Sequence, residues 1–172
     1  MVPDTVSTRP LRRSLAAGLL VGVAGLLAVL SGEPAVFPSL GPTAYVLAMN
    51  RGASAPGRRR VVGGHAIGVV AGLLAYHLLA SGAVVTGSIE PLSVPTLGLA
   101  ASAVLSVTLT ALGMSVLDAR HPPACATTLI VSLGLLSAPL EGLLMLGSVV
   151  VLYETYGLAD GVAARTYKRG AA

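Results

Sequence analysis

Four long apolar runs dominate the chain and predict four membrane-spanning helices. They cover residues Ser14–Leu30, Val61–Leu79, Val94–Leu117 and Pro139–Tyr156. Each has about 17 to 24 residues, enough at about 1.5 Å per residue to cross a hydrocarbon core about 30 Å thick. The first run follows three arginines, as in a signal peptide, but it lacks a clear small-x-small cleavage site and further apolar runs follow it. We therefore expect it to remain as the first membrane helix.

Two shorter apolar runs lie between the long ones, and both contain prolines near their start. They are residues 35–50 (AVFPSLGPTAYVLAMN) and residues 121–138 (HPPACATTLIVSLGLLSA). Hydropathy alone would leave both as loops or re-entrant segments, so the number of crossings has to be argued from charge.

The basic residues favour six crossings. All eleven Lys and Arg residues lie within residues 9–13, 51–60 and 165–169 or at position 120. If all six runs cross and the N-terminus is inside, every basic residue falls inside, as the positive-inside rule requires. With only four crossings, the arginines of residues 51–60 would lie outside. The sequence therefore predicts a multi-pass protein of the cell membrane with both termini in the cytoplasm.

The six runs divide into two units with the same order: long helix, proline-opened short helix, long helix. The units cover about residues 12–80 and 93–157 of a single all-α membrane domain that spans residues 1–172. Because three crossings is an odd number, the second unit starts on the opposite side of the membrane, which makes an inverted repeat. Gly41-Pro42-Thr43-Ala44 is expected to open one short helix, and Pro122-Pro123-Ala124-Cys125 the other.

Glycines recur at every fourth position on two of the long helices. Gly64, Gly68 and Gly72 lie on the third run of the six, and Gly18 and Gly22 on the first. In a membrane this spacing lets helix backbones approach closely. We expect a packing role for all five.

The composition excludes several classes of protein. Only 10% of the residues are charged, against about 25% in a typical soluble domain. We therefore expect the surface of the protein to face the lipid bilayer. The net charge is +4, but the basic residues lie in short clusters between apolar runs, a pattern that argues against nucleic-acid binding. Cys125 is the one cysteine, and no two histidines or carboxylates are three or four residues apart on one helix. We expect no metal and no other cofactor.

The proline motifs suggest an anion site. A proline at the first helical position leaves the next N–H groups free, and each helix N-terminus carries roughly half a positive charge. Such an end binds anions readily, and within a bilayer it must be buried in protein or line a wet cavity. The free N–H groups are expected at Ala124, Cys125 and Ala126 and at Thr43, Ala44 and Tyr45, with hydroxyls from Thr43, Thr127 and Thr128. Alternatively, the prolines only kink or end helices.

Three histidines are candidates for a functional role. His121 could take up a proton near neutral pH or donate to an anion, or it could bond a local carbonyl and hold the start of the helix. His65 and His77 lie near the two ends of the run Val61–Leu79, where a position at the membrane interface is the simpler explanation.

Three motifs together resemble the HPP family of integral membrane proteins: HPPACATTLI, FPSLGPTAY and VVGGHAIG. The resemblance covers about residues 12–160. The family is usually described with four membrane helices, and the two short runs account for the difference from six. Plant and cyanobacterial members are linked to nitrite transport, which implies anion transport here. The site residues that the resemblance implies are His121, Pro122, Pro123, Gly41, Pro42, Gly64 and His65.

We therefore expect a transporter or channel for a small inorganic anion such as nitrite, and not an enzyme. Ala124, Cys125, Thr127 and Thr43 complete the expected site. Two alternatives stay open: a membrane scaffold that transports nothing, and a membrane-embedded enzyme that uses Cys125 or His121, for which no second catalytic group is evident. The sequence leaves the oligomeric state open, a homo-oligomer included.

Overall fold

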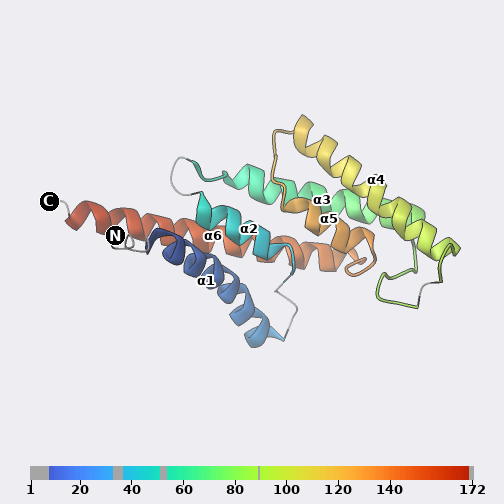
Figure 1. Ribbon diagram of the computed structural model, residues 1–172, viewed down its shortest axis with the longest axis horizontal. Coiled ribbons are helices and arrows are strands. Elements are labelled where there is room, and N and C mark those ends of the chain that lie inside the picture. The colour runs from blue at the N-terminus through green and yellow to red at the C-terminus, as the bar shows by residue number, and fades with distance from the viewer. Residues whose placement is uncertain (1–7, 33–36, 51–53, 89, 171–172) are drawn as a thin grey trace, which may run out of the picture.

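Six helices form the structure, a computed structural model that describes residues 8–32, 37–50, 54–88 and 90–170 (Figure 1). They are α1 Thr8–Ser31, α2 Leu40–Met49, α3 Arg58–Leu79, α4 Val94–Val116, α5 Ala124–Ser132 and α6 Pro139–Gly170. No strand occurs within these ranges. The all-helical prediction is confirmed, and each of the two proline-containing runs contains a short helix.

Four of the helices are long and apolar enough to cross a membrane. The apolar spans are Pro10–Leu30, Arg58–Leu79, Val94–Val116 and Pro139–Val162, which confirms the four long runs. Helices α1, α3 and α6 extend beyond the predicted runs, by the greatest length at the C-terminal end of α6. An apolar run marks only the part of a helix that suits lipid. The helix itself can continue into water through good helix formers such as Ala, Leu and Arg, and this accounts for the longer helices.

The helices run alternately in opposite directions along the long axis. Figure 1 shows α1, α3 and α5 running one way and α2, α4 and α6 the other. Helices α3 and α6 lie at the centre and contact each other. Helix α3 packs extensively against α4 and α5, helix α6 packs against α1 and α2, and the other extensive contacts are α1 with α2 and α4 with α5. This set of extensive contacts is unchanged when α1 is exchanged with α4, α2 with α5, and α3 with α6.

Three glycines bring α3 and α5 into close contact. A Cβ added to Gly64 would lie 2.9 Å from the Cβ of His121, and one added to Gly68 would lie 2.7 Å from Oγ1 of Thr128. A Cβ at Gly72 would lie 2.7 Å from the Cβ of Val131. These distances are too short for real side-chain contacts, so the predicted packing role of the three glycines is confirmed.

The same prediction is wrong for α1 within this chain. Nothing lies within 4 Å of a Cβ added to Gly18 or Gly22, and both residues are exposed. The four-residue spacing shows that another helix could pack closely against α1 at these glycines. It does not show that any helix does so.

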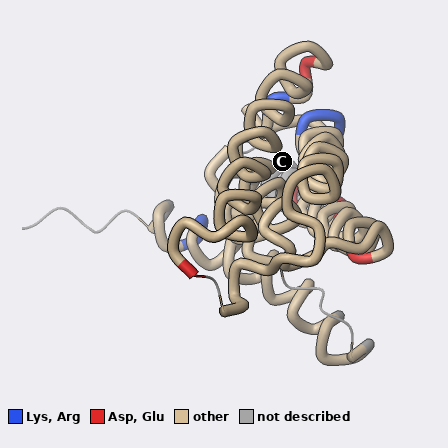
Figure 2. The backbone as a smooth tube through the Cα atoms, turned by 90° about the vertical axis from the view of Figure 1, so that its right-hand side faces the viewer, with Lys and Arg blue, Asp and Glu red and all other residues tan. Residues whose placement is uncertain are grey.

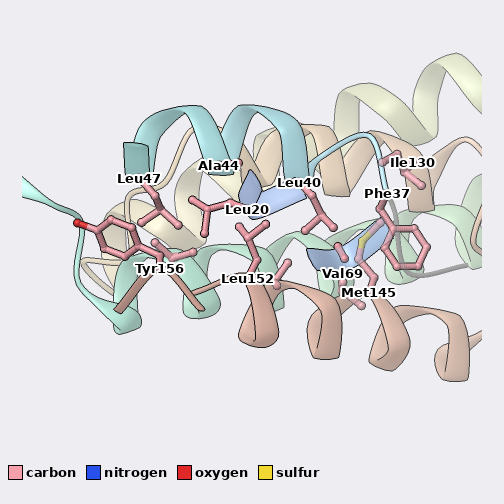
Figure 3. Close-up of a cluster of buried hydrophobic side chains, with 13 residues drawn as sticks. Leu20, Phe37, Leu40, Ala44, Leu47, Val69, Ile130, Met145, Leu152 and Tyr156 are labelled. Atoms are coloured by element: carbon pink, nitrogen blue, oxygen red, sulfur yellow. The ribbon is translucent and has the colours of Figure 1, made fainter. Parts of the chain in front are cut away.

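The largest apolar core joins α1, α2 and α6 and also includes Val61 and Val69 of α3 and Ile130 of α5. Leu20 from α1, Leu40 and Leu47 from α2, and Met145 and Leu152 from α6 meet there (Figure 3). This core holds α2 against α6, and the same buried face of α2 carries Thr43 to its contact with α3.

Charged residues are few and scattered along the chain (Figure 2), and the arginines at the start of α3 bind the end of α4 and the later part of α6. Arg58 at the start of α3 pairs with Glu154 of α6 at 3.0 Å, and Arg60 pairs with Asp118 at 3.9 Å. Nη2 of Arg59 donates to the carbonyl oxygen of Leu117 at 2.7 Å. These exposed pairs contribute little stability, but they place the start of α3, the end of α4 and the later part of α6 at one face.

The two ends of α3 should therefore lie on opposite sides of the membrane. In a Cys125→Ala background, an impermeant maleimide should label Ser88→Cys in intact cells and label Ser54→Cys only after the cells are opened. Both positions are exposed, and six crossings with the basic end inside put only Ser88 outside. Labelling of Ser54→Cys in intact cells would contradict this topology.

Candidate functional site

The two short helices begin in the same way. The N–H of Leu40, the first residue of α2, donates to the carbonyl of Phe37 at 2.9 Å. The N–H of Ala124, the first residue of α5, donates to the carbonyl of His121 at 2.9 Å. The N-cap residues, Ser39 and Pro123, both have helical backbone angles. Phe37-Pro38-Ser39 therefore corresponds to His121-Pro122-Pro123.

This correspondence corrects the predicted one, which matched Gly41–Ala44 with Pro122–Cys125. Helix α2 begins two residues before Pro42, so Pro42 is its third residue, where a missing N–H is still harmless. Gly41, Pro42 and Pro122 are exposed. The structure does not bring these three residues to the site.

The predicted free N–H groups after Pro123 are also wrong. Those of Ala124, Cys125 and Ala126 donate to the carbonyls of His121, Pro122 and Pro123 at 2.9, 3.0 and 3.1 Å. Tight bonds of this kind, three residues apart, commonly satisfy the first donors of a helix. In α2, Thr43, Ala44 and Tyr45 are the fourth to sixth residues and lie past the positions that have free N–H groups.

Side chains, not backbone donors, meet where the short helices begin. Oγ1 of Thr43 lies 2.9 Å from Nε2 of His65 and 3.2 Å from Nε2 of His121. Nδ1 of His65 lies 2.6 Å from Oγ1 of Thr127. Three of these residues have no exposed surface, and His121 is 1% exposed. We call these four residues the imidazole cluster; they come from α2, α3, α5 and the turn before α5.

The direction of each hydrogen bond follows from the carbonyl of Ser39. Oγ1 of Thr43 donates its one proton to that carbonyl at 3.0 Å, because a carbonyl can only accept. At Thr43 both imidazoles must then donate through Nε2–H. A neutral His65 then accepts through Nδ1 from the hydroxyl of Thr127. Both imidazoles are therefore assigned the Nε2–H form.

A second row of hydroxyls continues from the cluster along α4 and α5. Oγ1 of Thr128 lies 2.8 Å from Oγ1 of Thr110, and Ser102 donates to the carbonyl of Ser132 at 2.9 Å. Ser102, Ser106 and Thr110 have no exposed surface and lie four residues apart on one face of α4. The sequence analysis missed this row, although hydroxyls at every fourth position of an apolar helix are a usable signal.

Ser39 is the other residue that the sequence analysis missed. Its Oγ is buried and has no hydrogen-bond partner among the described residues. Ser39 lies four residues before Thr43 on the same helix face, since the N-cap has helical angles. That face meets the two imidazoles.

The remaining predicted residues support the cluster or lie away from it. Gly64 and Ala124 are buried where α3 meets α5, and Pro123 is the buried N-cap. Cys125 is half-buried and free. His77 is exposed and packs edge-on against Tyr76. Within the described ranges, no group of three or more His, Cys, Asp or Glu residues is placed to hold a metal ion.

A family comparison matches nearly the whole chain. The family model described as HPP, transmembrane region, matches residues 4–165. The chain belongs to the HPP family. The His-Pro-Pro sequence at residues 121–123 supplies His121 of the imidazole cluster and the buried N-cap Pro123. This HPP protein matches no curated protein and no solved structure.

Removing the shared hydroxyl should destabilise the bundle. Thr43→Val leaves the Nε2–H groups of His65 and His121 buried without their acceptor, at a cost of about 1–3 kcal/mol per stranded donor. Thermal unfolding in detergent should show a lower free energy of unfolding for Thr43→Val, and Thr43→Ser should stay close to the parent. The matched control is Thr108→Val, because Thr108 is exposed and bonds only the carbonyl of Val104. Equal stability of Thr43→Val and Thr108→Val would contradict the assigned network.

Proposed function

We propose that this HPP protein is a transporter or channel for a small inorganic anion, with a nitrite-like oxyanion as its substrate. The observation that carries the proposal is the hydroxyl of Thr43 shared by two imidazoles in the interior of the helix bundle. Polar and ionisable residues within membrane helices are costly, and they usually face the interior of a bundle and mark a pathway.

The chemistry of the cluster suits a monovalent anion. The Nε2–H groups of His65 and His121 and the hydroxyl of Ser39 are donors, and both Nε2–H groups point at one acceptor, Oγ1 of Thr43. An oxyanion that enters beside Thr43 offers a stronger acceptor to the same donors. The described side chains in contact there carry no fixed charge when the imidazoles are neutral. Such a site can bind an anion and release it again.

An inverted repeat explains why the short helices meet at this point. Their matching first turns, their opposite directions and the exchangeable set of helix contacts all support it. Helix α2 has ten residues and α5 nine, so each covers roughly 15 Å, about half of the hydrocarbon core. Transporters of this plan place their sites at broken helices near the midplane.

The arginines at residues 58–60, at the start of α3, support an orientation with that end of α3 in the cytoplasm and the loop between α3 and α4 outside. On this account the protein is a multi-pass protein of the cell membrane and is not an enzyme. Transport itself separates this proposal from the scaffold alternative.

Flux into proteoliposomes tests the proposal. Purified protein should carry nitrite above the rate of protein-free liposomes, in a panel with nitrate, formate and chloride. Thr127→Val, which removes the donor to Nδ1 of His65, should lower the flux by about tenfold, a loss of about 1.4 kcal/mol. The matched control Thr108→Val should keep the parental rate. Folded protein that carries none of the four anions would favour the scaffold.

A further inference from the structure

Two hydrogen-bonding positions, one in the imidazole cluster and one on the neighbouring residue Ser39, are unused. One is Oγ of Ser39, which is buried without a partner. The other is Nδ1 of His121, because the described residues give the His121 ring a single hydrogen bond, through Nε2 to Thr43. His65 differs in this respect, since both of its ring nitrogens are bonded.

These two positions are of opposite kind. The hydroxyl of Ser39 makes no hydrogen bond, so its proton is available to donate. Nδ1 of His121 is an acceptor, because Nε2 carries the proton of the neutral ring. An oxyanion alone satisfies Ser39 but would face the lone pair of Nδ1. An oxyanion accompanied by one proton satisfies both.

We propose that the protein carries its anion together with one proton, and that Nδ1 of His121 is the atom that takes this proton. The inference rests on the proposed function and adds the co-transported ion to it. When the protonated oxyacid enters, its O–H bond breaks and the electron pair stays on the oxygen. The lone pair of Nδ1 forms the new N–H bond. The imidazolium and the oxyanion together carry no net charge, and release reverses the step.

The surroundings of His121 offer the imidazolium no other counter-ion among the described residues. From α2 it meets Thr43, and from α3 it meets Gly64 and the ring of His65, with ring centroids 5.3 Å apart. From α4, the sulfur of Met114 accepts from its backbone N–H at 3.5 Å. The charged residues of its own turn are engaged elsewhere: Asp118 pairs with Arg120 and with Arg60. The anion is therefore the partner of the positive charge.

The difference between the two halves sets the number of protons at one. In the first half, Phe37 stands where the second half has His121. In the second half, Pro123 stands at the N-cap where the first half has Ser39. At these matching positions the two halves thus supply one ring nitrogen without a hydrogen bond, Nδ1 of His121, and one free hydroxyl, that of Ser39.

The experiment measures nitrite uptake into proteoliposomes that contain a pH-sensitive dye, with the membrane potential set by potassium and valinomycin. Protein-free liposomes give the leak of nitrous acid, which is subtracted. Nitrite uptake should acidify the interior by one proton per anion. An acidic exterior should speed uptake at least several-fold, and changes of membrane potential should leave uptake unaltered.

His121→Gln tests the proton-accepting atom. The amide can keep a donor toward Thr43 but cannot take up a proton, so the acceleration by an acidic exterior should disappear and uptake at acidic pH should fall about tenfold. The matched control is His77→Gln at an exposed position outside the cluster, which should behave like the parent.

Ser39→Ala covers the case in which His121→Gln fails to fold. Its hydroxyl has no partner, so the variant should keep the parental thermal stability while its half-saturating nitrite concentration rises several-fold. Unchanged nitrite transport by folded Ser39→Ala would overturn the site.

The remaining outcomes separate this inference from the proposed function. Nitrite flux that follows the membrane potential and ignores the pH gradient, or a full proton response in His121→Gln, would overturn proton coupling and leave anion transport intact. No flux of nitrite, nitrate, formate or chloride by folded protein would overturn both.

Discussion

The hydroxyl of Thr43 is the interaction on which the centre of the bundle depends. It accepts from two imidazoles and donates to the carbonyl of Ser39, and so it joins α2 to α3 and to the turn before α5. In an apolar environment each of these donors needs a partner. The polar atoms therefore fix where the short helices begin. Gly64 allows the approach, because a Cβ there would collide with the Cβ of His121. Packing and hydrogen bonding thus act on the same few residues.

Much of the fold could be predicted because bilayers restrict the choices. Residues 61–79 and 94–117 had to be helices, since an apolar run of that length has no other way to satisfy its backbone in lipid. The four-residue glycine spacing correctly marked Gly68 as a packing residue. The same spacing failed at Gly18, because a sequence shows which helix face could be approached and not which neighbour is present.

The site could be predicted only in part. His65, His121, Thr43 and Thr127 were all candidates, but their meeting depends on how the two halves pack, which local patterns do not contain. The first turns were misjudged by assuming that a helix starts at the last proline of a motif. Leu40 instead bonds the carbonyl of Phe37 and starts the helix two residues before Pro42. Backbone donors were expected at the site, and side-chain donors are found there, since the first turn of α5 satisfies its own N–H groups.

The central claim is that α2, α3 and the turn before α5 converge at Thr43, and an engineered metal site measures this directly. Both Nε2 atoms lie close to Oγ1 of Thr43, at 2.9 and 3.2 Å. A thiolate at that position would complete a set of one sulfur and two nitrogen ligands, which suits tetrahedral Zn²⁺ or Co²⁺. In a Cys125→Ala background, Thr43→Cys should bind Co²⁺ with the visible absorption of a tetrahedral thiolate complex, and adding His65→Leu should abolish it. Folded Thr43→Cys protein that binds no more Co²⁺ than the Cys125→Ala parent would contradict the account.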